Sequence, residues 1–148
     1  NWYSTSYNPV TGLYYVQTND KCGVFTKIPM EWAAGKGYMG GSFAQAPNEP
    51  AQRVLRAIDI QTGKIAWELP QAGPVTSWGG VLSTANGLVF FGADSGAFMA
   101  ADAATGKPLW SFEANHNWKA SPMTYVFDNK QHVAVAVGSS IVAFGLPD

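Results

Sequence analysis

The sequence predicts an all-β protein, and two observations carry that prediction. The first is a repeated sequence motif, which we call the repeated phrase. It occurs as "AIDIQTGKIAW" at 57–67 and as "AADAATGKPLW" at 100–110, and the two copies are identical at six positions and 43 residues apart. The second is the alternation of short apolar runs with Asn-Gly and Asp-Ser-Gly turn signals. A period of this length is typical of the four-stranded antiparallel blades of a β-propeller. We therefore expect about three such blades.

The second copy of the repeat shows the expected blade most clearly. Positive φ is tolerated by Asn, Asp and Gly, so tight turns are expected at 86–87, 94–96 and 105–107. Four strands then fall at about 79–84, 87–92, 97–101 and 108–112. This blade is expected to cover about residues 71–114.

The first copy has the same order with one interruption. A strand within "TGLYYV" at 11–16 is followed by an insertion at 17–52, and "VLRAIDIQTGKIAW" then supplies the last two strands. The first blade is expected to span about residues 1–70. The insertion is rich in Gly, Pro and aromatic residues, and ordered loops of this length serve as functional lids or packing flaps. We expect a flap that covers a blade edge.

The third copy, about residues 115–148, is expected to be incomplete. It contains strands within "MTYVF", "HVAVAVG" and "IVAFGL". No further copy of the "TGKxxW" part of the repeat follows, so this blade is expected to lack its outer strand. Three blades do not close a ring of four to eight. The chain, 1–148, is therefore expected to be a partial β-propeller whose partners are the remaining blades of a longer parent. Association of copies through open blade edges is a further possibility.

Composition excludes several classes of function. The formal net charge is −1 and no basic cluster is present, which argues against nucleic acid as a partner. No apolar run approaches the roughly 18 residues of a transmembrane segment. Cys22 is the only cysteine, so no internal disulfide is expected. His116 and His132 are isolated, which predicts no metal site, and no motif of a catalytic nucleophile or paired acid and base is present.

Three tryptophans occupy equivalent places, where the innermost strand of each blade is expected to start. They are Trp2, Trp78 and Trp118, preceded by Asn1, Ser77 and Asn117. Innermost strands line the axis of a propeller, so these rings predict a funnel suited to a planar, polar, aromatic ligand, which His116 could also face. The alternative is that the rings only plug the axial channel.

The repeated phrases resemble the tryptophan-docking motifs of PQQ-dependent quinoprotein alcohol and sugar dehydrogenases. "NWYSTSYNPVTGLYYV", "YMGGSF", "SWGGVLSTANGLVFFGADSG" and "SPMTYVFDNKQHVAVAVGSSIVAFGL" are similar, in this order, to the C-terminal region of that family. The resemblance covers essentially the whole chain. It implies an eight-bladed ring in the periplasm, with pyrroloquinoline quinone (PQQ) on the axis beside a Ca²⁺ or lanthanide ion. An alcohol or sugar substrate is oxidised there, and the electrons then leave to a cytochrome.

By this resemblance, Asn1 matches the asparagine that hydrogen-bonds the quinone, and Trp78 matches a tryptophan that contacts it. With Trp2 and Trp118, these residues are the predicted cofactor-binding set. At Trp118 the family more often has a smaller residue. The family's adjacent-cysteine disulfide, metal ligands and catalytic Asp come from upstream blades, so no catalytic or metal residue is expected here. The chain is expected to supply one wall of the pocket and to be inactive alone.

A second interpretation stays open at this point. Plain docking repeats also occur in PQQ-like propellers that are not enzymes and that serve as binding or assembly scaffolds. In such a protein the axial tryptophans would only fill the channel.

Overall fold

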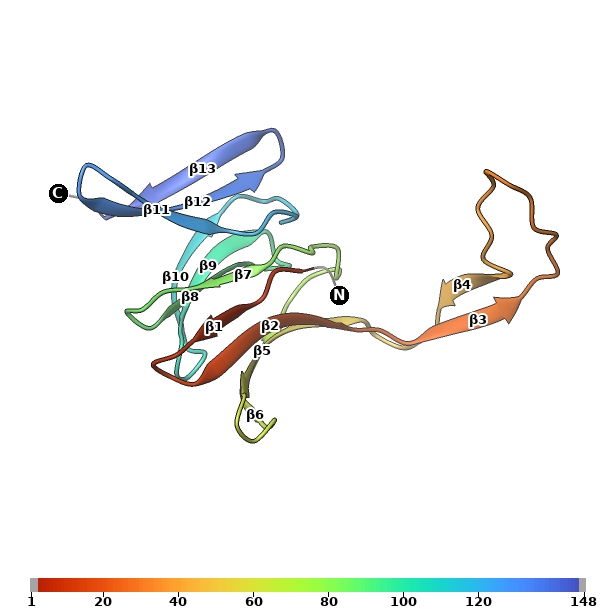
Figure 1. Cartoon of the computed structure of the whole chain (residues 1–148), viewed down its shortest axis with the longest axis horizontal. Helices are drawn as coiled ribbons and strands as arrows, with labels where there is room; N and C mark the ends of the chain where they lie inside the picture. Colours follow the sequence, from red (N-terminus) through yellow and green to blue (C-terminus); the bar gives the residue numbers. More distant parts are fainter. Residues whose placement is uncertain (1–2, 147–148) are drawn as a thin grey trace.

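The computed structural model describes residues 3–146, and within them every regular element is a β-strand (Figure 1). The strands form one sheet for each expected blade and a separate hairpin. This confirms the predicted all-β architecture. The described residues contain no helix that is long and apolar enough to cross a membrane. Two of the predicted site residues, Asn1 and Trp2, lie outside the described part of the chain.

The first blade is a sheet in the order β1-β2-β5-β6, with every neighbouring pair antiparallel. Its strands are β1 (Ser6–Asn8), β2 (Leu13–Asp20), β5 (Gln52–Asp59) and β6 (Ile65–Gln71). Strand β2 continues to Asp20, where it pairs with Gln52, because the alternating pattern of the strand runs on beyond Val16. The insertion that leaves the blade is therefore shorter than the sequence indicated.

The second and third blades follow the same plan. The second contains β7 (Val81–Ser83), β8 (Leu88–Gly92), β9 (Ala97–Asp102) and β10 (Pro108–Glu113). The third contains β11 (Met123–Phe127), β12 (Lys130–Val137) and β13 (Ser140–Gly145). In the described residues this last sheet has three strands, and β13 is its open edge.

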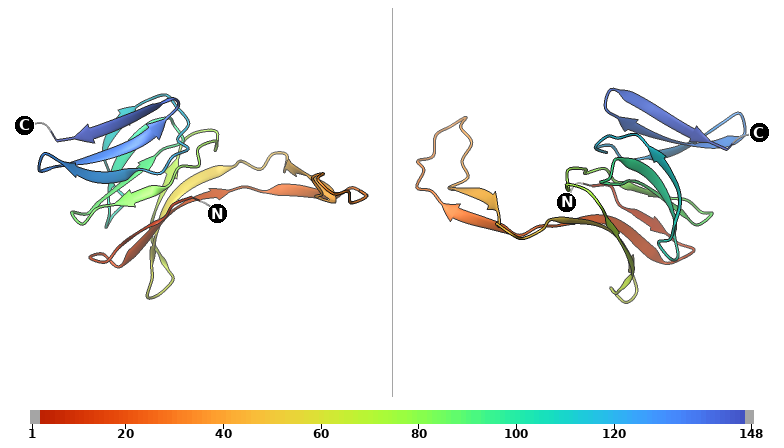
Figure 2. Two further views of the ribbon diagram at one scale, coloured as in Figure 1. Left: turned by 45° about the horizontal axis from the view of Figure 1, so that its top comes forward. Right: turned by 180° about the vertical axis from the view of Figure 1, so that it is seen from behind.

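The insertion forms an arm of residues 21–51 that reaches away from the blades (Figures 1 and 2). Strands β3 (Gly23–Lys27) and β4 (Gly41–Gln45) pair with each other and with no blade. Large apolar side chains along it are exposed, among them Phe25, Trp32 and Met39. The arm therefore does not cover a blade edge of this chain, contrary to the expectation from its composition.

The blades are held together by two apolar clusters. The first joins the first and second blades and includes Leu13, Tyr15, Leu55, Val89 and Phe91. The second joins the second and third blades and consists of Phe98, Trp118, Val133 and Val135, with Phe144 packed against it. Each blade thus buries one face against the next blade, as stacked layers must in order to form a core.

The repeated phrase builds the turn between the last two strands of a blade. In the second copy the Asp102 carboxylate accepts hydrogen bonds from the backbone N–H groups of Ala104 and Thr105, at 3.1 and 2.8 Å. Asp59 caps the first copy in the same way. The pKa of Asp102 is lowered most by a further hydrogen bond from the Thr105 hydroxyl and then by these backbone hydrogen bonds, and the pKa of Asp59 is lowered by its backbone hydrogen bonds.

The tryptophan that ends the first copy packs on the turn of the next blade. Trp67 Nε1 donates to the carbonyl of Ala103 at 3.0 Å, and a Cβ placed on Gly106 would lie 2.5 Å from the Trp67 ring. Only glycine allows this approach. Trp110, its equivalent in the second copy, lies against Phe144 of the third blade with ring centroids 5.1 Å apart.

Candidate functional site

Several connections leave the blades at the same end, which we call the site face. Because neighbouring strands are antiparallel, the segments that follow β2, β6, β8, β10 and β12 all emerge at one end of the sheets. These segments are the arm, the loops 72–80 and 114–122, and the turns 93–96 and 138–139. The site face therefore collects long loops held by a rigid scaffold, and binding residues are found disproportionately on such loops.

Trp78 lies on the 72–80 loop of the site face. Trp78 is 40% exposed to solvent, so its ring is available to a ligand. The Trp78 backbone N–H donates to the carbonyl of Trp118 at 2.9 Å, which ties the two loops together. The ammonium group of Lys119 lies 4.4 Å from the centre of the Trp78 ring. The exposed aromatic ring is thus paired with a cation on the same surface.

Asp94 holds the backbone that leads to Trp78. Its carboxylate is buried and accepts hydrogen bonds from the N–H groups of Val75, Thr76 and Ser77, the last two at 3.0 and 2.9 Å. Val75 has φ of 58°, a conformation that a β-branched residue rarely adopts. Three hydrogen bonds to one carboxylate stabilise this strained backbone, and strain of this kind is typical of functional loops.

Arg53 of β5 holds the same loop at the two residues that flank Trp78. Its fully buried guanidinium donates to the carbonyl of Ser77 and, at 3.0 Å, to the carbonyl of Gly79. It also donates to Gln17 Oε1 at 2.9 Å. Burial lowers the pKa of Arg53, and Tyr3 and Asp94 act in the opposite direction. Arg53 and Asp94 together form a clamp that fixes the backbone around Trp78.

Gln17 connects the clamp to the blades. Its amide nitrogen donates to the carbonyls of Gly79 and Gly92 at 3.2 and 3.3 Å, and its oxygen also accepts from Gln71. Gln71 in turn accepts from the Asp94 N–H at 3.0 Å. In the described residues no buried side-chain polar atom lacks a hydrogen-bond partner. A fully satisfied buried network is rigid, so the loop is fixed by both the first and the second blade.

Trp118 occupies a different environment from Trp78, although the sequence aligns the two. It is fully buried, its ring N–H donates to the carbonyl of Gly96 at 3.1 Å, and its ring packs on Phe98 at 5.2 Å. A Cβ on Gly92 would lie 2.2 Å from Trp118 Cβ, so the glycine opens the space that the side chain fills. The predicted position of Trp118 was the wall of the funnel, whereas the structure places its ring between the second and third blades.

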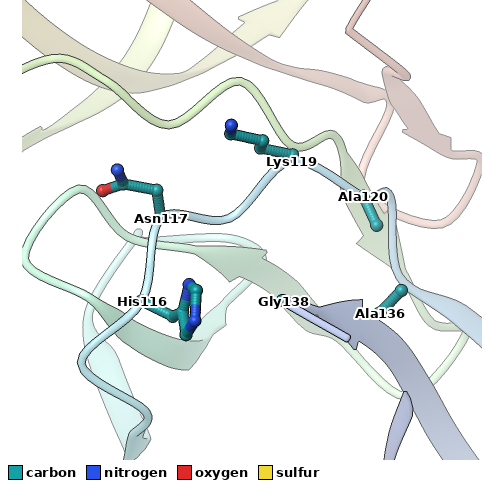
Figure 3. A pocket seen from close by; sticks show the side chains of 6 residues that line it. All are labelled: His116, Asn117, Lys119, Ala120, Ala136 and Gly138. Carbon is teal, nitrogen blue, oxygen red and sulfur yellow. The ribbon is translucent and has the colours of Figure 1, made fainter. Parts of the chain in front are cut away.

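A cavity of about 410 Å³ opens beside these loops (Figure 3). Its lining residues are His116, Asn117, Lys119, Ala120, Ala136 and Gly138. Asn117 Oδ1 accepts a hydrogen bond from Thr76 Oγ1 at 3.0 Å, which joins the cavity wall to the clamped loop. The lining contains basic and amide groups and no carboxylate, so its chemistry favours an anionic ligand.

The described residues contain no group of three or more His, Cys, Asp or Glu side chains that could hold a metal ion. His132 stacks on Tyr125 in the third blade, with ring centroids 5.2 Å apart. His132 and His116 therefore lie in separate environments. Cys22, at the base of the arm, is exposed.

The sequence reasoning missed Arg53 and Asp94. A signal for Arg53 was present, because it stands in the strand "RVLRAID", where a charged residue beside apolar ones must either reach the surface or find buried partners. Asp94 was interpreted only as a turn residue. Its hydrogen bonds to a loop about 18 residues earlier leave no local pattern.

Comparison with known proteins agrees with this architecture. Residues 48–133 match the PQQ family model described as the glucose/ethanol/alcohol dehydrogenase β-propeller domain. The chain is 37% identical over 139 residues to the quinoprotein alcohol dehydrogenase PedH of Pseudomonas putida, covering 93% of this chain and 23% of that protein. It is 35% identical over 136 residues to the lanthanide-dependent methanol dehydrogenase of Methylorubrum extorquens, covering 90% of this chain and 22% of that protein.

A solved structure of a related protein contains the same fold. The crystal structure of quinohemoprotein alcohol dehydrogenase from Comamonas testosteroni superposes with a TM-score of 0.82 and 31% identity, over 96% of this chain and 22% of that one. The chain thus spans less than a quarter of the length of each of these relatives. The family match covers more than half of the chain, and the chain therefore belongs to the β-propeller family of PQQ-type glucose, ethanol and alcohol dehydrogenases.

Proposed function

We propose that this chain forms one wall of the cofactor pocket of a quinoprotein dehydrogenase that oxidises an alcohol or a sugar. The observation that carries the proposal is the exposed Trp78 ring, which the Arg53–Asp94 clamp fixes on the site face. A binding surface is more effective when its shape is set before the ligand arrives. The names of the relatives, which are quinoprotein alcohol and methanol dehydrogenases, supply the class of reaction.

The residues on the site face fit PQQ, a planar quinone that carries carboxylates. A flat ring is offered by Trp78, and positive charge is offered by Lys119 beside it. When bound, PQQ supplies the electron-accepting chemistry for oxidation of the substrate. The role of this chain is to bind and orient the quinone. Asn1 and Trp2, which precede the described residues, are proposed to complete this wall, with Asn1 as a hydrogen-bond donor to the quinone.

Other parts of the parent protein are proposed to complete the reaction centre. A Ca²⁺ or lanthanide ion would be held by ligands outside this chain, and so would the residue that takes the proton from the substrate. A cytochrome would receive the electrons, and the periplasm is the proposed location. Without the metal ligands and the proton acceptor, we expect this chain alone to be inactive.

The remaining blades are the proposed partners of the arm and of the open edge at β13. Exposed apolar side chains such as Phe25 and Met39 are suited to burial against another part of a propeller. An unpaired edge strand is suited to pairing with one more strand. Association of two copies through these surfaces is the competing outcome, and light scattering across a concentration series separates a monomer from an oligomer.

The proposal is tested by titrating this chain with PQQ and Ca²⁺ while following tryptophan fluorescence. We expect quenching in the wild-type chain, a loss of that quenching in Trp78→Ala, and no change of affinity in Trp32→Ala, because Trp32 lies in the connection between β3 and β4 of the arm and is exposed. Absence of quenching at high micromolar PQQ, or equal quenching in Trp78→Ala, contradicts the proposal. A non-catalytic scaffold would then be the better description.

A further inference from the structure

We propose that Lys119 and Asn117 form a carboxylate-binding subsite on the site face, next to Trp78, for an acid group attached to a planar aromatic ring. The inference extends the proposed function, and it rests on that proposal for one point, that the site face is the surface that meets the ligand. Its own evidence is the charge, the donor geometry and the cavity at these residues.

Lys119 supplies the positive charge of the subsite. In the described residues the ion pairs are both made by Arg56, with Asp20 and Glu68. Lys119 is exposed and makes no ion pair among the described residues, although its ammonium lies 4.4 Å from the centre of the Trp78 ring. An aromatic ring attracts a cation and restricts its position but does not neutralise it. Lys119 therefore presents an uncompensated positive charge in a fixed place.

Asn117 lies two residues earlier on the same loop. Its Oδ1 accepts from Thr76 Oγ1 at 3.0 Å, and this hydrogen bond sets the orientation of the amide. The amide nitrogen makes no hydrogen bond within the described residues, so it is free to donate to a ligand. Figure 3 shows the Asn117 amide nitrogen and the Lys119 ammonium extending to the same side of the loop.

The Lys119 ammonium and the Asn117 amide are suited to bind one carboxylate together. The lining of the cavity of about 410 Å³ contains no carboxylate that would repel an anion. A carboxylate accepts charge-assisted hydrogen bonds from an ammonium and an amide together, and an aromatic ring attached to it would lie beside the exposed Trp78 ring. The carboxylate could belong to the quinone cofactor or to a separate aromatic acid. Both sources use the same donors.

The experiment uses the 148-residue chain and two probes that differ only in charge, quinoline-2-carboxylate and the neutral quinoline-2-carboxamide. Binding is followed by tryptophan fluorescence and by the NMR shift of the Lys119 side chain. We expect the acid to bind more tightly than the amide, and Lys119→Met to weaken acid binding about tenfold or more, as loss of a charge-assisted hydrogen bond predicts. Lys119→Arg should restore most of the affinity.

Lys107→Met is the matched control, because Lys107 lies at the turn between β9 and β10, at the opposite end of the blade. It removes the same charge and should leave acid binding unchanged. Equal binding of acid and amide, no binding of the acid at millimolar concentration, or no effect of Lys119→Met overturns the inference. Weaker acid binding at high salt supports it.

A parallel titration with PQQ and with its neutral trimethyl ester distinguishes the two sources of the carboxylate. If PQQ binding weakens both on esterification and in Lys119→Met, the subsite holds the cofactor. If quinoline-2-carboxylate depends on Lys119 while PQQ does not bind, the subsite serves a separate aromatic acid, and the proposed function fails while the inference stands. If PQQ binds equally tightly to the wild-type chain and to Lys119→Met, the proposed function stands and the inference fails.

Discussion

The ring N–H of Trp67 in the first blade donates to the backbone carbonyl of Ala103 in the second blade, at 3.0 Å. The same ring lies over Gly106, close enough that a Cβ there would be 2.5 Å away. Ala103 and Gly106 belong to the second copy of the repeated phrase, and Trp67 ends the first. One repeated motif thus supplies both halves of the contact between blades, a tryptophan ring that packs on the following blade and a turn that receives the ring of the preceding blade.

Replacement of Trp67 tests how much this joint stabilises the pair of blades. We expect Trp67→Ala to lower the free energy of unfolding by about 3–5 kcal/mol, the range for loss of a large packed aromatic side chain. Urea unfolding followed by circular dichroism measures the change. Trp32→Ala is the control, with an expected change within about 0.5 kcal/mol, because Trp32 is 70% exposed. Equal effects of the two variants would show that the joint contributes little.

Two arginines on β5 provide a second test, since they differ mainly in burial. Arg53→Met leaves the carbonyl of Ser77 without its buried donor and removes one of the two donors of the Gly79 carbonyl, the other being Gln17, and we expect a loss of about 3 kcal/mol or more. Arg56→Met removes surface ion pairs to Asp20 and Glu68 and should cost about 1 kcal/mol or less. Urea midpoints measure both losses.

The same pair of variants reports on the position of Trp78. Loss of the clamp should increase the solvent accessibility of the 72–80 loop, which faster amide hydrogen exchange at Thr76 and Ser77 would detect. Arg56→Met should leave these exchange rates unchanged. If Arg53→Met also leaves them unchanged, the Asp94 hydrogen bonds alone fix the loop and Arg53 has no positioning role.

The strands and turns could be predicted because their signals are local. Asp102 and Gly106 stand at fixed positions in a short phrase, and their capping and positive φ depend on residues close in the chain. The period of the repeat then fixes the number of strands in each blade. This is why the predicted order of strands agrees with the structure, in which residues 3–146 give the third sheet three strands.

The interior of the site could not be predicted in the same way. Arg53 reaches Ser77 and Gly79 from another strand, and no periodic pattern records such a contact. Trp118 was equated with Trp78 because both precede an innermost strand, yet the space opened by Gly92 draws Trp118 into the core. The arm was expected to cover a blade edge because of its length and its Gly, Pro and aromatic residues, but neither length nor composition gives a direction in space.

Acid should destabilise the chain through the capping carboxylates. Hydrogen bonds lower the folded-state pKa of Asp59 and Asp102, and a hydrogen bond to Arg56 lowers that of Asp20. A depressed pKa contributes stability above the unfolded value of about 3.9, and this stability is lost as the pH falls through the lower folded-state pKa. We expect urea midpoints to be constant near neutral pH and to decrease below about pH 4. Asp102→Asn keeps an acceptor oxygen and should reduce this decrease; an identical pH profile would contradict the assignment.

Gly92 offers a test of why Trp118 is buried. A Cβ added there would lie 2.2 Å from Trp118 Cβ, so Gly92→Ala must shift either β8 or the 114–122 loop. Overpacking of this kind costs about 1–3 kcal/mol, and it should also disturb the Trp78 backbone, whose N–H donates to the Trp118 carbonyl. We expect a lower urea midpoint together with a changed near-ultraviolet circular dichroism spectrum. Gly87→Ala is the control for a glycine with open space, where only the positive φ of 81° opposes the substitution. If Gly92→Ala is no more destabilising than Gly87→Ala and leaves the aromatic spectrum unchanged, the burial of Trp118 does not depend on this contact.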